Sequence, residues 1–136
     1  MRRRTSLAVA IFGLVMCVAA SAGEIPLVAS TLVPGASGKV SYEHDRSGNI
    51  KLHMQTQNLA APEQLSPAKN AYVVWIEPRD GQPQNAGVLR VSKDLRGSFS
   101  TTTPSKSFDI KVTAEDNPTV SQPAGPEIFH GGVQTR

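Results

Sequence analysis

Cysteine is nearly absent from this sequence, and its absence narrows the possible chemistry. The single cysteine, Cys17, lies in an apolar stretch near the N-terminus, so the chain from Gly23 onward has no thiol. This rules out disulfides, thiol nucleophiles, cysteine-ligated zinc, iron–sulfur clusters and blue-copper centres in that part of the chain. We therefore expect a domain held together by packing alone, which is feasible because dependence on disulfides begins in much smaller domains.

An excess of charge is also missing once the N-terminus is set aside. Of the 14 basic residues, Arg2, Arg3 and Arg4 stand at the start, so the chain from Gly23 onward carries 11 basic and 11 acidic residues. Binding to nucleic acid or to an anionic membrane surface needs clustered lysine and arginine. We therefore expect no nucleic-acid partner and no polybasic membrane patch.

The first 22 residues have the form of a signal peptide. Three arginines precede an apolar stretch, and Ala20-Ser21-Ala22 matches the small-x-small pattern that precedes a cleavage site. We expect cleavage before Gly23, which leaves residues 23–136 as a single domain, exported to the periplasm or the cell exterior. The alternative is an uncleaved anchor formed by residues 7–22, although this run is shorter than the ~20 residues that span a bilayer.

Apolar residues with a helical period are lacking from Gly23 onward, and a period of two takes their place. Ile50, Leu52 and Met54 alternate with polar residues, as do Val40 and Tyr42 just before them. This alternation is typical of strands with one buried face. The turn-forming residues between the two runs predict a β-hairpin.

In the run Ala71–Ile76, the residues at both odd and even positions are apolar or aromatic, which is typical of a strand buried on both faces. Further short runs follow it, whereas residues 60–70 have no alternation and are expected to form a loop that crosses between sheets. Seven or eight short strands with frequent turns predict an all-β fold, an antiparallel β-sandwich of immunoglobulin-like architecture, with a small barrel as the alternative. The expected core consists of the large apolar residues of these strands: Leu52, Met54, Tyr72, Val74, Trp75, Ile76, Leu89, Phe99, Phe108, Ile110 and Val112.

The second half of the chain resembles a known family. The segments that carry the resemblance are Ala71–Ile76, Ala86–Leu89 after a turn, Phe108–Glu115, Pro123-Ala124-Gly125-Pro126, and the closing Ile128–Gly131. Over Tyr72 to Gly131 they are similar to the extracytoplasmic C-terminal domain of anti-sigma-K-type factors. The family's proline after the glutamate is absent here, and so is its cytoplasmic sigma-binding module. The resemblance implies an outer-side β domain detached from sigma control.

Binding residues are expected in loops, where sandwich folds usually carry recognition. The Ser98–Thr103 strand also offers a polar edge for a peptide or glycan, although a simple solvated strand accounts for it as well. Trp75 is expected in the core rather than as a sugar-stacking platform. The best candidate for a binding rim is the loop that follows Trp75, with the residues Glu77, Arg79, Asp80, Gln82, Gln84 and Asn85.

Catalysis and cofactor binding are not expected. No nucleophile-elbow sequence of the form Gly-x-Ser-x-Gly occurs, so we predict no catalytic residues and a protein that is not an enzyme. His53 and Met54 are adjacent, and since neighbouring strand residues point to opposite faces they cannot share one ion. His44 and His53, across the hairpin, are the weak candidates for a metal pair, and solvated surface histidines are the expected alternative.

These observations favour an exported, non-enzymatic β domain with an interaction or envelope-structural role and an unidentified protein or envelope partner. A carbohydrate- or peptide-binding module is the first alternative, and a periplasmic metal-binding protein that uses His44 and His53 is the second.

Overall fold

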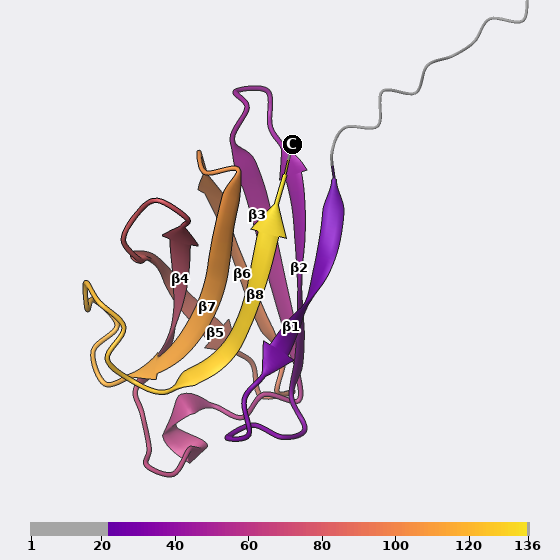
Figure 1. Cartoon of the computed structure of the whole chain (residues 1–136). Coiled ribbons are helices and arrows are strands. Elements are labelled where there is room, and N and C mark those ends of the chain that lie inside the picture. Colours follow the sequence, from indigo (N-terminus) through magenta and orange to yellow (C-terminus); the bar gives the residue numbers. More distant parts are fainter. Residues whose placement is uncertain (1–21, 136) are drawn as a thin grey trace, which may run out of the picture.

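Eight antiparallel strands make up most of the part of the chain that the structure, a computed structural model, describes: residues 22–135 (Figure 1). The predicted all-β antiparallel fold with seven or eight short strands is confirmed. A single 3₁₀ turn, η1 (Pro62–Gln64), interrupts the crossing segment between the third and fourth strands. The strands are β1 (Gly23–Ala29), β2 (Ser37–His44), β3 (Ile50–Gln57), β4 (Ala71–Pro78), β5 (Gln84–Val91), β6 (Gly97–Thr103), β7 (Ser107–Glu115) and β8 (Glu127–Gln134).

The expected signal peptide falls almost entirely outside the described residues, of which Ala22 is the first. Among residues 22–135, no helix has the length and apolar character needed to cross a bilayer.

The strands close into a barrel in the order β1-β2-β3-β6-β5-β4-β7-β8, where the sequence had predicted two separate sheets. Closure depends on β1 and β5, because each of these strands changes its partner along its length. β1 pairs with β2 as far as Leu27 and then, over two residues, with β8. β5 pairs with β4 as far as Leu89 and then, over two residues, with β6. We call these two short ladders the β1–β8 seam and the β5–β6 seam.

The predicted hairpin is formed by β2 and β3, which pair over their full lengths. The Asp45 carboxylate fixes the turn, because its Oδ1 accepts the backbone N–H groups of Ser47 at 2.8 Å and Asn49 at 2.9 Å. Burial alternates along β3, with Ile50, Leu52 and Met54 inside, as the two-residue period requires.

The interior is filled by apolar side chains from every strand of the barrel except β6, which contributes the half-buried Phe99 at its margin. Ten of the eleven residues expected in the core are buried, and Phe99 is the exception because it lies at the β5–β6 seam, opposite Gly87. The core also contains fully buried residues that were not in the expected set, among them Val40, Ile50, Leu59, Ile128 and Phe129.

Tyr72 ties β4 to the segment that crosses from β3. Its hydroxyl donates a hydrogen bond to the carbonyl oxygen of Ala60 at 2.6 Å, and the side chain is buried. Burial raises the pKa of the Tyr72 hydroxyl from 10.0 to about 12, and the negative charge of Glu63 adds to the rise.

The raised pKa of Tyr72 predicts a loss of stability in strong alkali. The folded state holds the Tyr72 proton more tightly than the unfolded state, so this contribution is intact below pH 10 and is lost as the pH rises from 10 through about 12. In a Tyr42→Phe variant Tyr72 is the only tyrosine left, and its near-ultraviolet tyrosinate absorbance is expected to appear with a midpoint near pH 12. The same variant in concentrated urea should titrate near pH 10. Equal midpoints in the two titrations would contradict the burial of this hydroxyl.

Candidate functional site

The barrel has two contrasting outer faces, and the first is covered by the chain itself. β4 is buried on both sides, as its sequence predicts, with Tyr72, Val74 and Ile76 facing the core. Val73 and Trp75 lie on the opposite, outer side and are nevertheless fully buried. The loop of residues 116–126 between β7 and β8 is bonded to β5 through Asn85 and to β7 through Glu115, and β4 lies between these two strands. We infer that this loop, rather than a second sheet, covers Val73 and Trp75.

A chain of buried hydrogen bonds holds this covering loop. The Trp75 indole N–H donates to Thr113 Oγ1 at 2.8 Å, and the Thr113 hydroxyl donates to Glu115 Oε2 at 2.6 Å. The Glu115 carboxylate, which is 2% exposed, also accepts the backbone N–H groups of Ala124 at 3.1 Å and Gly125 at 2.9 Å. A buried carboxylate is tolerated here because both of its oxygens are hydrogen-bonded.

Two further contacts fix the path of the loop. Gly125 lies so close to β7 that a Cβ atom there would overlap the carbonyl oxygen of Ala114, and only glycine fits. At the other end, the Asn85 side-chain amide donates to the carbonyl oxygens of Pro118 and Val120, both at 2.9 Å. Trp75 and Glu115 are therefore structural, and this face offers no access to β4.

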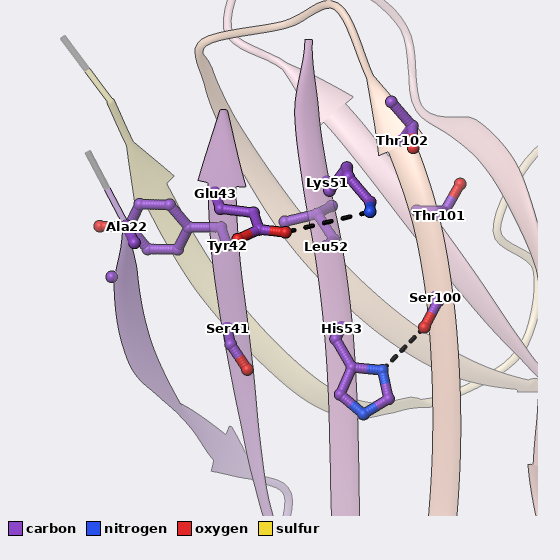
Figure 2. Close-up of a pocket in the computed structure, with 11 residues that line it drawn as sticks. Ala22, Ser41, Tyr42, Glu43, Lys51, Leu52, His53, Ser100, Thr101 and Thr102 are labelled. Atoms are coloured by element: carbon purple, nitrogen blue, oxygen red, sulfur yellow. Dashed lines mark hydrogen bonds and ion pairs between the residues drawn. The ribbon is translucent and has the colours of Figure 1, made fainter. Parts of the chain in front are cut away.

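The second outer face, formed by β2, β3 and β6, has no such cover within residues 22–135 and carries a depression of about 590 Å³ (Figure 2). Register brings its outward residues into rows, since Ser41 pairs with His53 and His53 with Ser100, while Glu43 pairs with Lys51 and Lys51 with Thr102. Figure 2 shows the side chain of Tyr42 at one end of the depression, next to Ala22.

The polar contacts within the depression are few and exposed. His53 Nδ1 and Ser100 Oγ are hydrogen-bonded at 2.7 Å, and Lys51 Nζ lies 3.9 Å from Glu43 Oε1 with both side chains 60% exposed. The Lys51–Glu43 pair contributes little to stability because solvent screens it. These groups supply hydroxyl, imidazole, ammonium and carboxylate partners for hydrogen bonds. The arrangement suits the binding of a polar ligand.

The predicted rim consists partly of exposed residues and partly of residues that contact other parts of the chain. Arg79, Asp80, Gln82 and Gln84 are exposed. Glu77 is engaged by Lys111, whose Nζ lies 3.2 Å from Glu77 Oε2, and Asn85 is committed to the covering loop. None of the six predicted residues lines the depression.

The two candidate histidines of the metal-binding alternative occupy different faces. His44 pairs with Ile50, which points into the core, whereas His53 pairs with Ser41, whose register position faces outward. The hairpin therefore does not join them around one ion. Among residues 22–135, no group of three histidine, cysteine or acidic side chains is placed to hold a metal.

The comparison with known proteins adds no relative. No family model matches the chain, and no curated protein is significantly similar to it. The resemblance to the outer domain of anti-sigma-K-type factors thus stays a prediction.

Replacement of Glu115 by glutamine is expected to loosen the covering loop. The amide nitrogen of glutamine would face N–H donors in place of an accepting oxygen, which we expect to cost about 1–3 kcal/mol of unfolding free energy. Trp75 is the only tryptophan, so quenching of its fluorescence by acrylamide should rise in Glu115→Gln together with the loss of stability in urea.

Asp94→Asn provides the control, because Asp94 is an exposed acid in the turn between β5 and β6. It should leave both the quenching and the urea midpoint unchanged. If Glu115→Gln behaved like this control, the carboxylate would not be what holds the loop.

Proposed function

We propose that this chain is an exported, non-enzymatic domain that acts by binding a protein or another component of the cell envelope, similar in role to the outer-side domain of anti-sigma factors. The single observation that carries the proposal is the contrast between the two outer faces. The β4 face is sealed by the chain's own loop, whereas the polar face of β2, β3 and β6 is free of any such cover within residues 22–135 and is hollowed.

Two features support the likeness to anti-sigma outer domains. Glu115 and the Pro123-Ala124-Gly125-Pro126 segment both belong to the motifs that carry the resemblance, and they are joined by hydrogen bonds from Ala124 and Gly125. Among residues 22–135, the β1–β8 seam and the β5–β6 seam are ladders of two residue pairs each, which supports a likeness to the two sheets of an immunoglobulin-like sandwich. The leader sequence supplies the argument for export.

Binding at the depression is tested by filling it. Immobilised protein is incubated with an envelope extract, and the retained material is compared with that of Ser41→Trp, whose indole would occupy the depression. Thr119→Trp, on the exposed covering loop, is the matched control. We expect Ser41→Trp to lose most of the retained partner and Thr119→Trp to keep it. Equal retention by the two variants would refute binding at this face.

Export is tested separately. The protein recovered from the envelope fraction should begin at Gly23. An N-terminus that retains the leader would favour the anchored alternative.

Carbohydrate binding is the second candidate, favoured by the hydroxyl groups of Ser41, Ser100 and Thr102 around the depression. Trp75 cannot contribute a stacking platform because it is buried, and the aromatic residue that lines the depression is the half-buried Tyr42. Titration with chito-oligosaccharides, followed by the backbone NMR signals of β3 and β6, distinguishes this role from binding to a protein.

A further inference from the structure

The β5–β6 seam leaves one edge of β6 without a partner strand. β5 pairs with β6 only through Arg90–Ser98 and Val91–Gly97. Beyond Ser98, no strand among the described residues pairs with this edge of β6, and Figure 1 shows β5 and β6 diverging from their shared turn. Such an edge presents backbone N–H and C=O groups that are ready to pair.

The register identifies these backbone groups. The Ser92 N–H donates to the carbonyl oxygen of Arg96 at 2.8 Å, so the hydrogen-bonded pair two residues further along each strand is Arg90 with Ser98. Alternate residues of β6 therefore direct their backbone groups toward the seam, and beyond Ser98 these residues are Ser100 and Thr102.

The pairing of β6 with β3, at its opposite edge, independently identifies the same residues as those that face the seam. The Asp45 N–H donates to the carbonyl oxygen of Asn49 at 2.9 Å, which makes Glu43 and Lys51 the next hydrogen-bonded pair of β2 and β3. Lys51 thus bonds toward β2 and its neighbour Leu52 toward β6, where its partner is Thr101. Thr101 is therefore committed to β3, and the residues on either side of it face the seam.

The β1–β8 seam is equally short, but a proline closes it to strand addition. The Ser30 N–H donates to the carbonyl oxygen of Ile128, and Val28 pairs with His130, so the next β1 residue to face β8 is Pro26. Pro26 has no N–H, and the ladder ends there. By contrast, β6 contains neither proline nor a charged residue between Gly97 and Thr103.

The covering loop is attached to β5 beside the β5–β6 seam. β5 has a bulge next to Gly87, whose φ of +132° is a conformation that favours glycine. Asn85, just before the bulge, accepts the Gly87 N–H through its Oδ1 and donates to two carbonyl oxygens of the loop. These bonds fix the start of β5 to the covering loop, and this part of β5 does not pair with Ser100 or Thr102 of β6.

We propose that this edge of β6 binds an extended segment of a partner polypeptide by strand addition. Only a polypeptide backbone offers donors and acceptors at the spacing of Ser100 and Thr102. A single segment fits better than a second copy of the barrel, because β5 borders the other side of the seam and would meet a whole sheet.

The seam also predicts the pattern of the bound segment. Residues opposite Ser100 and Thr102 face outward with those side chains, and the residue between them faces inward, near the half-buried Phe99. The preferred segment therefore has an apolar residue between two small polar ones. The inference rests on the proposed binding role. It concerns the backbone edge of β6, whose Ser100 and Thr102 side chains also line the depression, whereas Ser41 lies on β2, two strands away from this edge.

Hydrogen exchange by NMR tests the edge directly. In the free protein the amides of Ser100 and Thr102 should exchange much faster than that of Thr101, which is bonded to β3. A heptapeptide of alternating threonine and valine, at about 1 mM, should slow exchange at Ser100 and Thr102. Fast exchange that the peptide does not change, or slow exchange at all three amides of the free protein, would overturn the proposal.

N-methylated peptides are the matched controls. Methylation of the threonine amides, which face β6 in the expected register, should weaken binding by about tenfold or more, whereas methylation of the valine amides should not. Equal binding by both peptides would exclude strand addition. Slowing of exchange that increases with protein concentration and needs no peptide would identify a second copy as the occupant and overturn the linear partner.

A Thr102→Pro variant removes one seam donor and leaves the ladder to β3 intact, so it should keep the native Trp75 emission and lose the peptide. If this variant does not fold, the N-methylated peptides still decide the question. Ser41→Trp should retain peptide binding, so a failure at the seam is distinguishable from a failure at the depression.

Discussion

The buried carboxylate of Glu115 is the group on which the organisation of the surface depends. It joins the end of β7 to Ala124 and Gly125, and through Thr113 it reaches the indole of Trp75. Without these bonds, the outer face of β4 would expose Val73 and Trp75 to water. The loop seals that face, whereas the polar face of β2, β3 and β6 has no such cover within residues 22–135.

The same loop is attached to one of the two strands that close the barrel. Asn85 attaches it to β5 just before the bulge, and β5 then runs beside β6 for two residue pairs only. At the other seam Pro26 ends the ladder between β1 and β8. Each seam therefore closes the barrel over two residue pairs only. At the β1–β8 seam, Pro26 lacks the N–H that would extend the ladder. At the β5–β6 seam, the start of β5 is bonded to the covering loop and does not pair with β6.

Much of the fold could be predicted from alternation, because period two directly reports which side chains face a core. Alternation predicted the hairpin around Asp45, and the lack of alternation in Ala71–Ile76 predicted that this strand is buried on both faces. The sequence did not predict which part of the chain covers the outer face of β4. An apolar strand indicates that both faces are covered, but it does not say whether a sheet or a loop covers them.

The candidate site was harder to predict, for a geometrical reason. Ser41, His53 and Ser100 come from three strands and become neighbours only through register, which no local pattern specifies. The sequence did contain an indication of this face: every second residue is polar in 39–43, in 51–55 and in 98–102. These three segments predict a shared polar surface only when they are considered together. The side-chain amide of Asn85, which was predicted for a binding rim, is hydrogen-bonded to the covering loop. The sequence does not reveal this contact, because an asparagine that holds a loop and one that binds a ligand look alike.

The pairing of β1 with β8 has a consequence for how the chain reaches its folded state. These are the first and last strands, so the barrel cannot close until both ends of the domain are present together. Contacts between residues so far apart in sequence form late and slowly. Under the export proposed above, the chain would cross the membrane unfolded, and this order of events would delay completion of the barrel until the last strand has been made and has crossed.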